Sequence, residues 1–269
     1  MISTRLFKTL LIIGFSLILS VSYASDTAKE KRWADQISDS IMIGDAEWLK
    51  VGKSKIFSIF TEYTTEKAVG AAIILHGIGV HPNWDEIIRP LRSQLPDFGW
   101  STLSIQLPVL ANDAEYSSYA PLFNDIAPRI DAAVKFLKAK GINNIVVIGH
   151  SMGASMGAYY MSQKPDKSIT AFVSVGSTGR MFKDPEKNYF KSLEKITVPT
   201  VDIYGAIDLP DVINSAKRKN QIAKKAGNKN YTQIKIAGAN HFFANKEEIL
   251  IKRIRGWLNK NAPGTEIKK

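Results

Sequence analysis

The 269-residue sequence contains no cysteine. Disulfide bonds are therefore excluded, and the fold must be stabilised by its hydrophobic core, which a chain of this length can supply. The lack of cysteine after the N-terminal apolar segment also excludes a lipid-modified N-terminus. Internal repeats and low-complexity tracts are lacking as well. With a hydrophobic fraction of 45%, the composition is that of an ordinary globular protein.

Acidic residues are in the minority, and the formal net charge is +11. Basic residues cluster at Lys217–Lys219, Lys224–Lys225, Lys252–Arg255 and Lys268–Lys269. We interpret these clusters as the solvated faces of helices. The alternative is a surface that makes weak contact with an anionic membrane or with anionic envelope polymers. We expect no nucleic-acid partner, because no nucleic-acid-binding motif accompanies the charge.

The first 24 residues have the pattern of a signal peptide. Arg5 and Lys8 precede an apolar run from Leu10 to Val21, and Ser22-Tyr23-Ala24 forms a small-x-small end. This pattern predicts cleavage after Ala24 and export, to the periplasm or out of the cell. The alternative is a retained anchor, but a spanning helix needs about 20 apolar residues and this run is shorter. Residues 25–269 are then expected to form a single domain without a linker.

Short β-branched runs alternate with longer amphipathic runs along this domain. The alternation predicts parallel strands joined by helices. The expected strands cover residues 47–51, 55–61, 71–75, 101–106, 144–148, 169–175, 200–204 and 232–236. The first two are expected to pair antiparallel at the sheet edge, because no helix separates them. The expected helices cover residues 29–43, 85–95, 124–140, 152–163, 212–226 and 246–260.

A G-x-S-x-G motif lies between an expected buried strand and a helix rich in small residues. The strand 144–148 leads directly into Gly149-His150-Ser151-Met152-Gly153. Such a sharp reversal holds the serine in a strained conformation, and the flanking glycines permit the close approach of strand and helix. Ser151 then lies at a helix N-terminus, which favours a developing anion. The alternative is a glycine-rich turn whose serine only caps the helix.

With this motif in this context, the chain resembles the α/β-hydrolase superfamily over nearly the whole of residues 25–269. The resemblance implies an α/β fold: an eight-stranded, mostly parallel sheet with helices on both faces. It also implies that Ser151 is a nucleophile. The strand around residues 100–108 further resembles exported bacterial hydrolases whose domain has no assigned substrate.

A serine hydroxyl needs a neighbouring base before it becomes a good nucleophile. The sequence has four histidines. His76 and His81 precede the nucleophile, and His150 is adjacent to Ser151, so its side chain is expected to point elsewhere and pack under the turn. His241 follows the last expected strand. The loop around it resembles the histidine loop of the superfamily, so His241 is the predicted base.

The order of the superfamily places the acid between the nucleophile and the histidine. Residues 201–208 have the pattern of a strand, a glycine turn and then Asp208, which is the predicted acid. Asp211 is the alternative if the turn is shorter, and Asp202 lies within the strand. The acid would orient the histidine and stabilise its protonated form.

His76-Gly77-Ile78-Gly79 follows the expected strand 71–75. The resemblance implies that this loop supplies one amide of an oxyanion hole, from Ile78 or alternatively Gly79, and that Met152 supplies the other. His76 is expected to be structural and to bond within the loop.

His81 and Trp84 are predicted to line the mouth of the substrate pocket, and the aromatic loop 106–121 either shapes this pocket or packs in the core. Residues 176–199 leave room only for a short cap with one helix near 187–193. We therefore expect an open active site, which argues against a lid-gated lipase.

The resulting functional prediction is a serine hydrolase that cleaves a small-molecule or lipid-like carboxylic ester or thioester without a metal or organic cofactor. The alternatives are an amidase or peptidase acting on envelope substrates, and a binding protein that retains the fold without turnover. A nucleophilic serine excludes haloalkane dehalogenase chemistry, which requires a carboxylate. Cofactor-free oxygenases and haloperoxidases keep the same three residues and stay as further alternatives.

Overall fold

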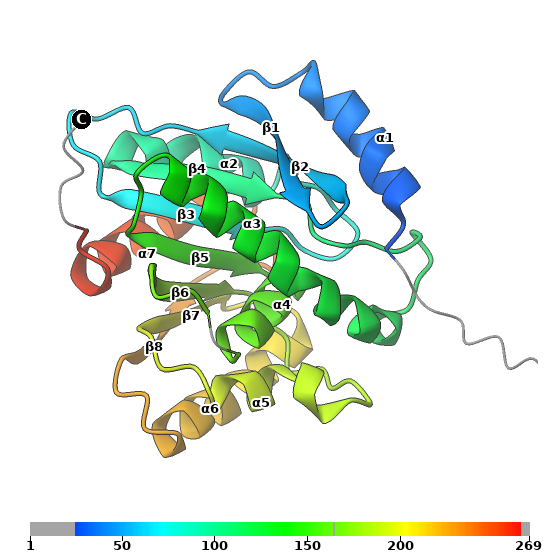
Figure 1. The fold of residues 1–269 in the computed structure, drawn as a ribbon. Coiled ribbons are helices and arrows are strands. Elements are labelled where there is room, and N and C mark those ends of the chain that lie inside the picture. Colours follow the sequence, from blue (N-terminus) through cyan, green and yellow to red (C-terminus); the bar gives the residue numbers. More distant parts are fainter. Residues whose placement is uncertain (1–24, 164, 265–269) are drawn as a thin grey trace, which may run out of the picture.

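The structure, a computed structural model, describes residues 25–163 and 165–264 (Figure 1). The predicted signal peptide and the Lys268–Lys269 cluster lie outside these residues. Within the described part, eight strands form one sheet in the order β1-β2-β4-β3-β5-β6-β7-β8. The strands are β1 (Asp45–Val51), β2 (Ser54–Thr61), β3 (Gly70–Leu75), β4 (Trp100–Ile105), β5 (Ile145–His150), β6 (Ile169–Val175), β7 (Thr200–Gly205) and β8 (Tyr231–Ile236).

The sheet is mostly parallel. From β4 to β8 every neighbouring pair is parallel, whereas β2 is antiparallel to both β1 and β4. The predicted antiparallel pair therefore lies at one edge, as expected. Strands β3, β4 and β5 are buried along their whole length, which is why they have nearly continuous apolar sequences.

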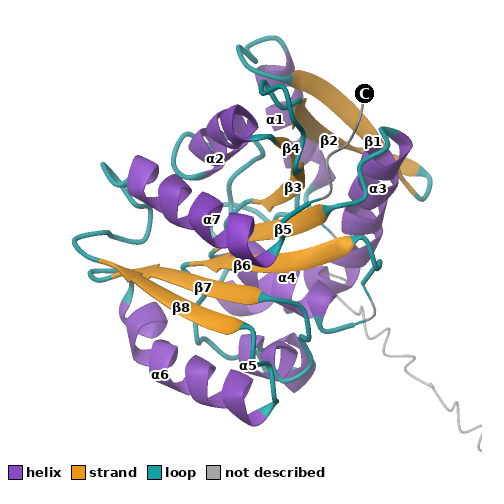
Figure 2. Ribbon diagram, turned by 90° about the vertical axis from the view of Figure 1, so that its left-hand side faces the viewer, coloured by secondary structure: helices purple, strands orange, loops and turns teal. Residues whose placement is uncertain are grey.

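Helices cover both faces of the sheet (Figure 2). The α-helices are α1 (Thr27–Ser38), α2 (Ile88–Gln94), α3 (Ile126–Ala139), α4 (Met152–Met161), α5 (Tyr189–Leu193), α6 (Pro210–Lys225) and α7 (Glu247–Asn261). Helices α2 and α7 pack in the hydrophobic core of one face, whereas α3, α4 and α5 pack in the core of the other. Helix α1 packs separately, on the side chains of Phe57 and Ile59 in β2. Both the fold class and the eight-stranded sheet predicted from the sequence are confirmed.

Helices α2 and α3 begin later than predicted. Helix α2 begins only at Ile88, because Ile87 has a φ of 54° and cannot continue a right-handed helix, and the 3₁₀ helix η1 (Leu95–Phe98) follows it. Helix α3 begins at Ile126 after a second 3₁₀ segment, η2 (Tyr116–Asp125), which contains Pro121. The short cap consists of the 3₁₀ helix η3 (Pro185–Lys187) and α5.

The interpretation of the basic clusters as solvated is wrong for one residue. Lys217 and Arg218 are exposed, but Lys219 is completely buried and pairs with Asp202. The helical periodicity of α6 turns Lys219 toward the sheet, where a carboxylate on β7 meets it.

Among the helices of the described part, none combines the length and the apolar character needed to cross a membrane.

Candidate active site

Ser151 lies in the tight turn between β5 and α4. Its φ is 54° and its ψ is −116°, so this non-glycine residue has the strained backbone that the motif predicts. The turn leaves no space for side chains at the flanking glycines. A Cβ on Gly153 would collide with the carbonyl oxygens of Leu75 and His76, and one on Gly149 would lie 2.5 Å from the carbonyl oxygen of Gly153.

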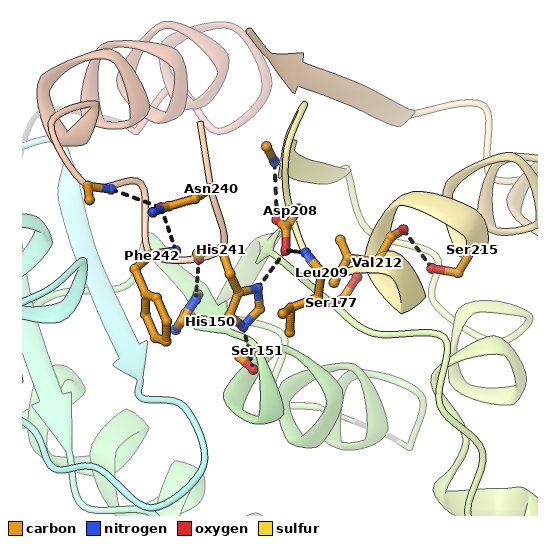
Figure 3. A network of polar contacts seen from close by, with 12 residues as sticks. His150, Ser151, Ser177, Asp208, Leu209, Val212, Ser215, Asn240, His241 and Phe242 are labelled. Atoms are coloured by element: carbon orange, nitrogen blue, oxygen red, sulfur yellow. Dashed lines mark hydrogen bonds and ion pairs between the residues drawn. The ribbon is translucent and has the colours of Figure 1, made fainter. Parts of the chain in front are cut away.

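Three side chains from separate turns meet at this position (Figure 3). His241, from the loop after β8, has its Nε2 atom 3.0 Å from Ser151 Oγ. Its Nδ1 atom lies 2.7 Å from Oδ1 of Asp208, which belongs to the turn after β7. The structure thus brings the predicted nucleophile, base and acid into one hydrogen-bonded chain, because β5, β7 and β8 all end at the same edge of the sheet.

Asp208 is the aspartate that contacts His241 among the three candidates. Asp211 instead accepts a hydrogen bond from Arg180 Nε at 2.5 Å and is partly exposed. Asp202 is completely buried against Lys219, away from the histidine. From the sequence, the choice between Asp208 and Asp211 depends on the length of the turn after the strand 200–204. In the structure this turn brings Asp208 to His241.

The surroundings of Asp208 favour its ionised form. Burial raises the pKa of this carboxyl, but the hydrogen bond and charge of His241, together with the amides of Gly205 and Leu209, lower it. The net pKa lies below the ordinary value. These amides donate to Oδ2 at 3.2 Å and to Oδ1 at 2.7 Å, respectively. Asp208 can therefore hold the imidazole in one orientation and stabilise its positive charge.

His150 packs against the candidate base. It was expected to point elsewhere and to pack under the turn. Its ring instead lies 4.9 Å from the ring of His241, centroid to centroid, and its Nε2–H donates to the carbonyl oxygen of His241 at 3.0 Å. Burial, followed by the nearby charge of His241, lowers the pKa of His150 to about 3, so the ring is neutral. Sequence reasoning missed this contact, although the position beside Ser151 was a signal for it.

The proposed oxyanion amides border the nucleophile. Met152 is the first residue of α4, so its amide has no acceptor within the helix. Across the turn, the Cα of Gly77 approaches so closely that a Cβ there would lie 3.6 Å from Ser151 Cβ. Ile78 lines the same pocket as Ser151, whereas Gly79 does not. Of the two alternatives in this loop, the geometry thus favours Ile78 over Gly79.

His76 is completely buried and stabilises the loop that contains Gly77 and Ile78. Its Nδ1–H donates to the carbonyl oxygen of Gly77 at 2.9 Å, and its Nε2 accepts from the amide of Leu107 at 2.9 Å. Burial lowers its pKa to about 3, which agrees with this neutral tautomer. His76 is therefore structural, as the sequence predicts.

A pocket of about 400 Å³ opens beside Ser151. The apolar and aromatic part of its wall is formed by Ile78, Val80, Trp84, Tyr116, Leu209 and Phe242, and Thr178 and Arg180 add polar groups. The predicted lining residue Trp84 is present, and Tyr116 shows that the aromatic loop 106–121 contributes to the wall.

The prediction for His81 is wrong, since this residue does not line the pocket. Its ring is held edge-on between Trp33 of α1 and Trp84, at centroid distances of 5.4 and 5.5 Å. Burial lowers its pKa to about 4. The sequence did not indicate this placement, because the contact with Trp33 depends on where α1 packs.

Comparison with known proteins gives a family and a fold. The sequence matches the family described as "Protein of unknown function (DUF3530)" over residues 24–121 and 111–260. No curated protein matches the sequence.

Several solved structures have a similar fold. The dienelactone hydrolase from Anabaena variabilis is 20% identical, with a TM-score of 0.65 over 81% of this chain and 98% of that one. The esterase Pf2001 from Pyrococcus furiosus is 18% identical, with a TM-score of 0.64 over 81% of this chain and 93% of that one. Est1E from Butyrivibrio proteoclasticus is 17% identical, with a TM-score of 0.61 over 81% of this chain and 98% of that one. The chain belongs to the DUF3530 family and has the α/β-hydrolase fold.

Proposed function

We propose that the protein is a serine hydrolase that cleaves a carboxylic ester or thioester through an acyl-enzyme. The observation that carries this proposal is the chain of two hydrogen bonds from Ser151 through His241 to Asp208, at distances of 3.0 and 2.7 Å. The esterases and dienelactone hydrolases among the structural neighbours support it at the level of the fold.

The geometry accounts for both halves of the reaction. His241 Nε2 accepts the proton of Ser151 as the oxygen attacks the carbonyl carbon, and then returns this proton to the leaving alcohol or thiol. In the second half His241 accepts a proton from the attacking water and returns it to Ser151 Oγ as the bond to the acyl group breaks, so that the carboxylic acid leaves and the enzyme is restored. The amides of Met152 and Ile78 would stabilise the tetrahedral oxyanion in each half, and one such donor lowers the barrier by about 3 kcal/mol.

The pocket supports a substrate with an apolar or aromatic group beside the reacting carbonyl. Its volume of about 400 Å³ accommodates a small molecule. Three of its apolar residues, Ile78, Leu209 and Phe242, are also partly exposed at 37%, 44% and 42%. A lipid-like ester could therefore extend along the rim while its carbonyl carbon lies at Ser151.

A panel of chromogenic esters of increasing acyl length, with matched anilides, tests the proposal. We expect turnover of esters, labelling by a fluorophosphonate probe, and loss of both in Ser151→Ala. The thermal midpoint of this variant should stay nearly unchanged, because one hydroxyl is removed without opening a cavity. Ser162→Ala, at the other end of α4, is a matched control that should retain full activity.

The outcomes separate the alternatives. Faster turnover of anilides than of esters would favour the amidase or peptidase. A folded protein that is neither labelled nor active would favour a binding protein of the same fold. Full activity of Ser151→Ala would refute the nucleophile assignment.

We also propose that the protein is exported and cleaved after Ala24, on the basis of the N-terminal sequence alone. The mass of the protein recovered from the producing cells checks this, since cleavage leaves a chain that begins at Ser25. A full-length, membrane-associated product would support the retained anchor instead.

A further inference from the structure

A charged side chain is completely buried beneath the active-site loops. Lys219 of α6 has no exposed surface. Its ammonium lies 2.8 Å from Oδ2 of Asp202 on β7, and it donates to the carbonyl oxygen and to Oγ of Ser177 at 3.1 and 2.9 Å. All three donor positions of the ammonium are thus used.

The carboxylate of Asp202 is equally well paired. Besides Lys219, it accepts hydrogen bonds from Ser177 Oγ at 3.0 Å, from the hydroxyl of Tyr231 at 3.2 Å and from Gln233 Nε2 at 3.0 Å. Burying two charges has a desolvation cost, and apolar residues of similar size often stabilise a fold as well as a buried ion pair does. The stability of the fold therefore does not explain why an ion pair is buried here. A need to place Ser177 exactly would explain it, because both charged groups bond to this serine.

Ser177 continues from Gly176, the residue that supports the candidate triad. A Cβ on Gly176 would lie 3.1 Å from Cε1 of His241 and 3.7 Å from Oδ2 of Asp208, so the backbone at this point packs directly against the histidine and the aspartate. Figure 3 shows Ser177 beside this pair. The amide of Gly176 donates to the carbonyl oxygen of Ile203 at 2.8 Å, which fixes the loop on the side of β7. The contacts of Ser177 with Lys219 and Asp202 fix the next residue of the loop.

Helix α6 holds the same loop at a second point. The amide of Gly179 donates to the carbonyl oxygen of Asp211 at 3.4 Å, and a Cβ on Gly179 would lie 2.5 Å from Cβ of Ser215. The loop that follows β6 is therefore enclosed between α6 on one side and the candidate triad on the other. A shift of Ser177 would be transmitted to His241 through Gly176.

We propose that Lys219 is a positioning residue for the triad: paired with Asp202, it anchors Ser177 so that Gly176 holds the imidazole of His241 in line between Asp208 and Ser151. This inference rests on the proposed hydrolase function. Lys219 does not touch the reacting atoms and acts only through the loop.

The test compares Lys219→Met with the double variant Lys219→Met/Asp202→Asn. The single variant leaves a buried carboxylate unpaired and should lose thermal stability, whereas the double variant removes both charges and should regain much of it. Neither variant restores a cation on the carbonyl oxygen of Ser177. We therefore expect kcat to fall about 10- to 100-fold in both variants, with KM changed by less than about threefold.

Two further measurements separate positioning from general stability. Leu137→Ala deletes a core side chain in α3, a helix that contributes no residue to the pocket, and should lower the thermal midpoint without lowering kcat. The downfield proton resonance of the hydrogen bond between His241 Nδ1 and Asp208 should be present in the wild-type protein and lost or shifted in both Lys219 variants.

Recovery of kcat together with stability in the double variant would overturn the inference, as would an unchanged resonance in both variants. Failure of the proposed function has a different signature, because the wild-type protein would then turn over no ester. The resonance still decides the role of Lys219 in that case, since it reports the geometry of His241 without requiring turnover.

Discussion

Replacing Asp208 with asparagine removes the charge of the candidate acid while nearly keeping its shape. Oδ1 of Asp208 faces both His241 Nδ1 and the amide of Leu209 at 2.7 Å, whereas Oδ2 faces only the amide of Gly205 at 3.2 Å. An asparagine oxygen in the Oδ1 position satisfies two of these three donors. We expect this orientation, in which His241 keeps the tautomer that can accept the proton of Ser151.

The expected loss is then the attraction between the protonated imidazole and the carboxylate. With about 4 Å between the charge centres and an effective dielectric constant of about 20, this attraction is about 4 kcal/mol. A barrier raised by about 4 kcal/mol lowers kcat about a thousandfold. If the amide nitrogen faced His241 instead, the wrong tautomer would result, and such a change lowers kcat about ten-thousandfold in a known triad.

The assay is kcat on the best ester of the panel, measured for Asp208→Asn and for Asp211→Asn. Asp211 is a matched control, because it is partly exposed and pairs with Arg180 rather than with His241. We expect Asp211→Asn to change kcat by less than about threefold, since exposed ion pairs contribute little. The reasoning is refuted if Asp208→Asn retains most of its kcat, or if the large loss occurs in Asp211→Asn.

Two predictions concern stability. Burial lowers the pKa of His76 from 6.5 to about 3, so the stability that depends on its neutral ring is fully present above pH 6.5 and is lost as the pH falls toward 3. Between pH 7 and 4.5 this loss should lower the free energy of unfolding by about 3 kcal/mol. Urea denaturation over this range should show a smaller decline in His76→Gln than in the wild type, and equal declines would contradict the assignment. Gly153→Ala should destabilise the fold by at least about 2 kcal/mol because of its backbone collisions, whereas Gly256→Ala in α7, where a Cβ meets nothing within 4 Å, should stabilise it by up to about 1 kcal/mol. Similar thermal midpoints for the two glycine variants would refute this.

Much of the fold and of the candidate triad could be predicted from the sequence because the decisive signals are local. Apolar runs such as 145–148 are typical of strands covered on both faces, and their alternation with amphipathic segments predicts a parallel sheet. The turn around Ser151 is marked by Gly149 and Gly153, where a Cβ would collide with backbone atoms. The chain order of the superfamily then singled out His241.

Other features depended on which distant residue faces a given side chain. Asp208 and Asp211 lie close together in the sequence, and only the contact with His241 distinguishes the acid from its neighbour. His81 belongs to the right loop for a pocket residue, but Trp33 of α1 holds its ring elsewhere.

Local pattern therefore determined the sheet and the nucleophile turn, because periodicity and turn chemistry act over a few residues, and the resemblance to the superfamily supplied the order of the three candidate residues. The tertiary structure decided the burial of Lys219 and the packing of His150 against His241. Both groups are polar, and neither the polar stretch around Lys219 nor the turn that contains His150 indicates which residue each side chain contacts. Their burial is stable only because Asp202, Ser177 and the carbonyl of His241 meet them from elements far away in the chain.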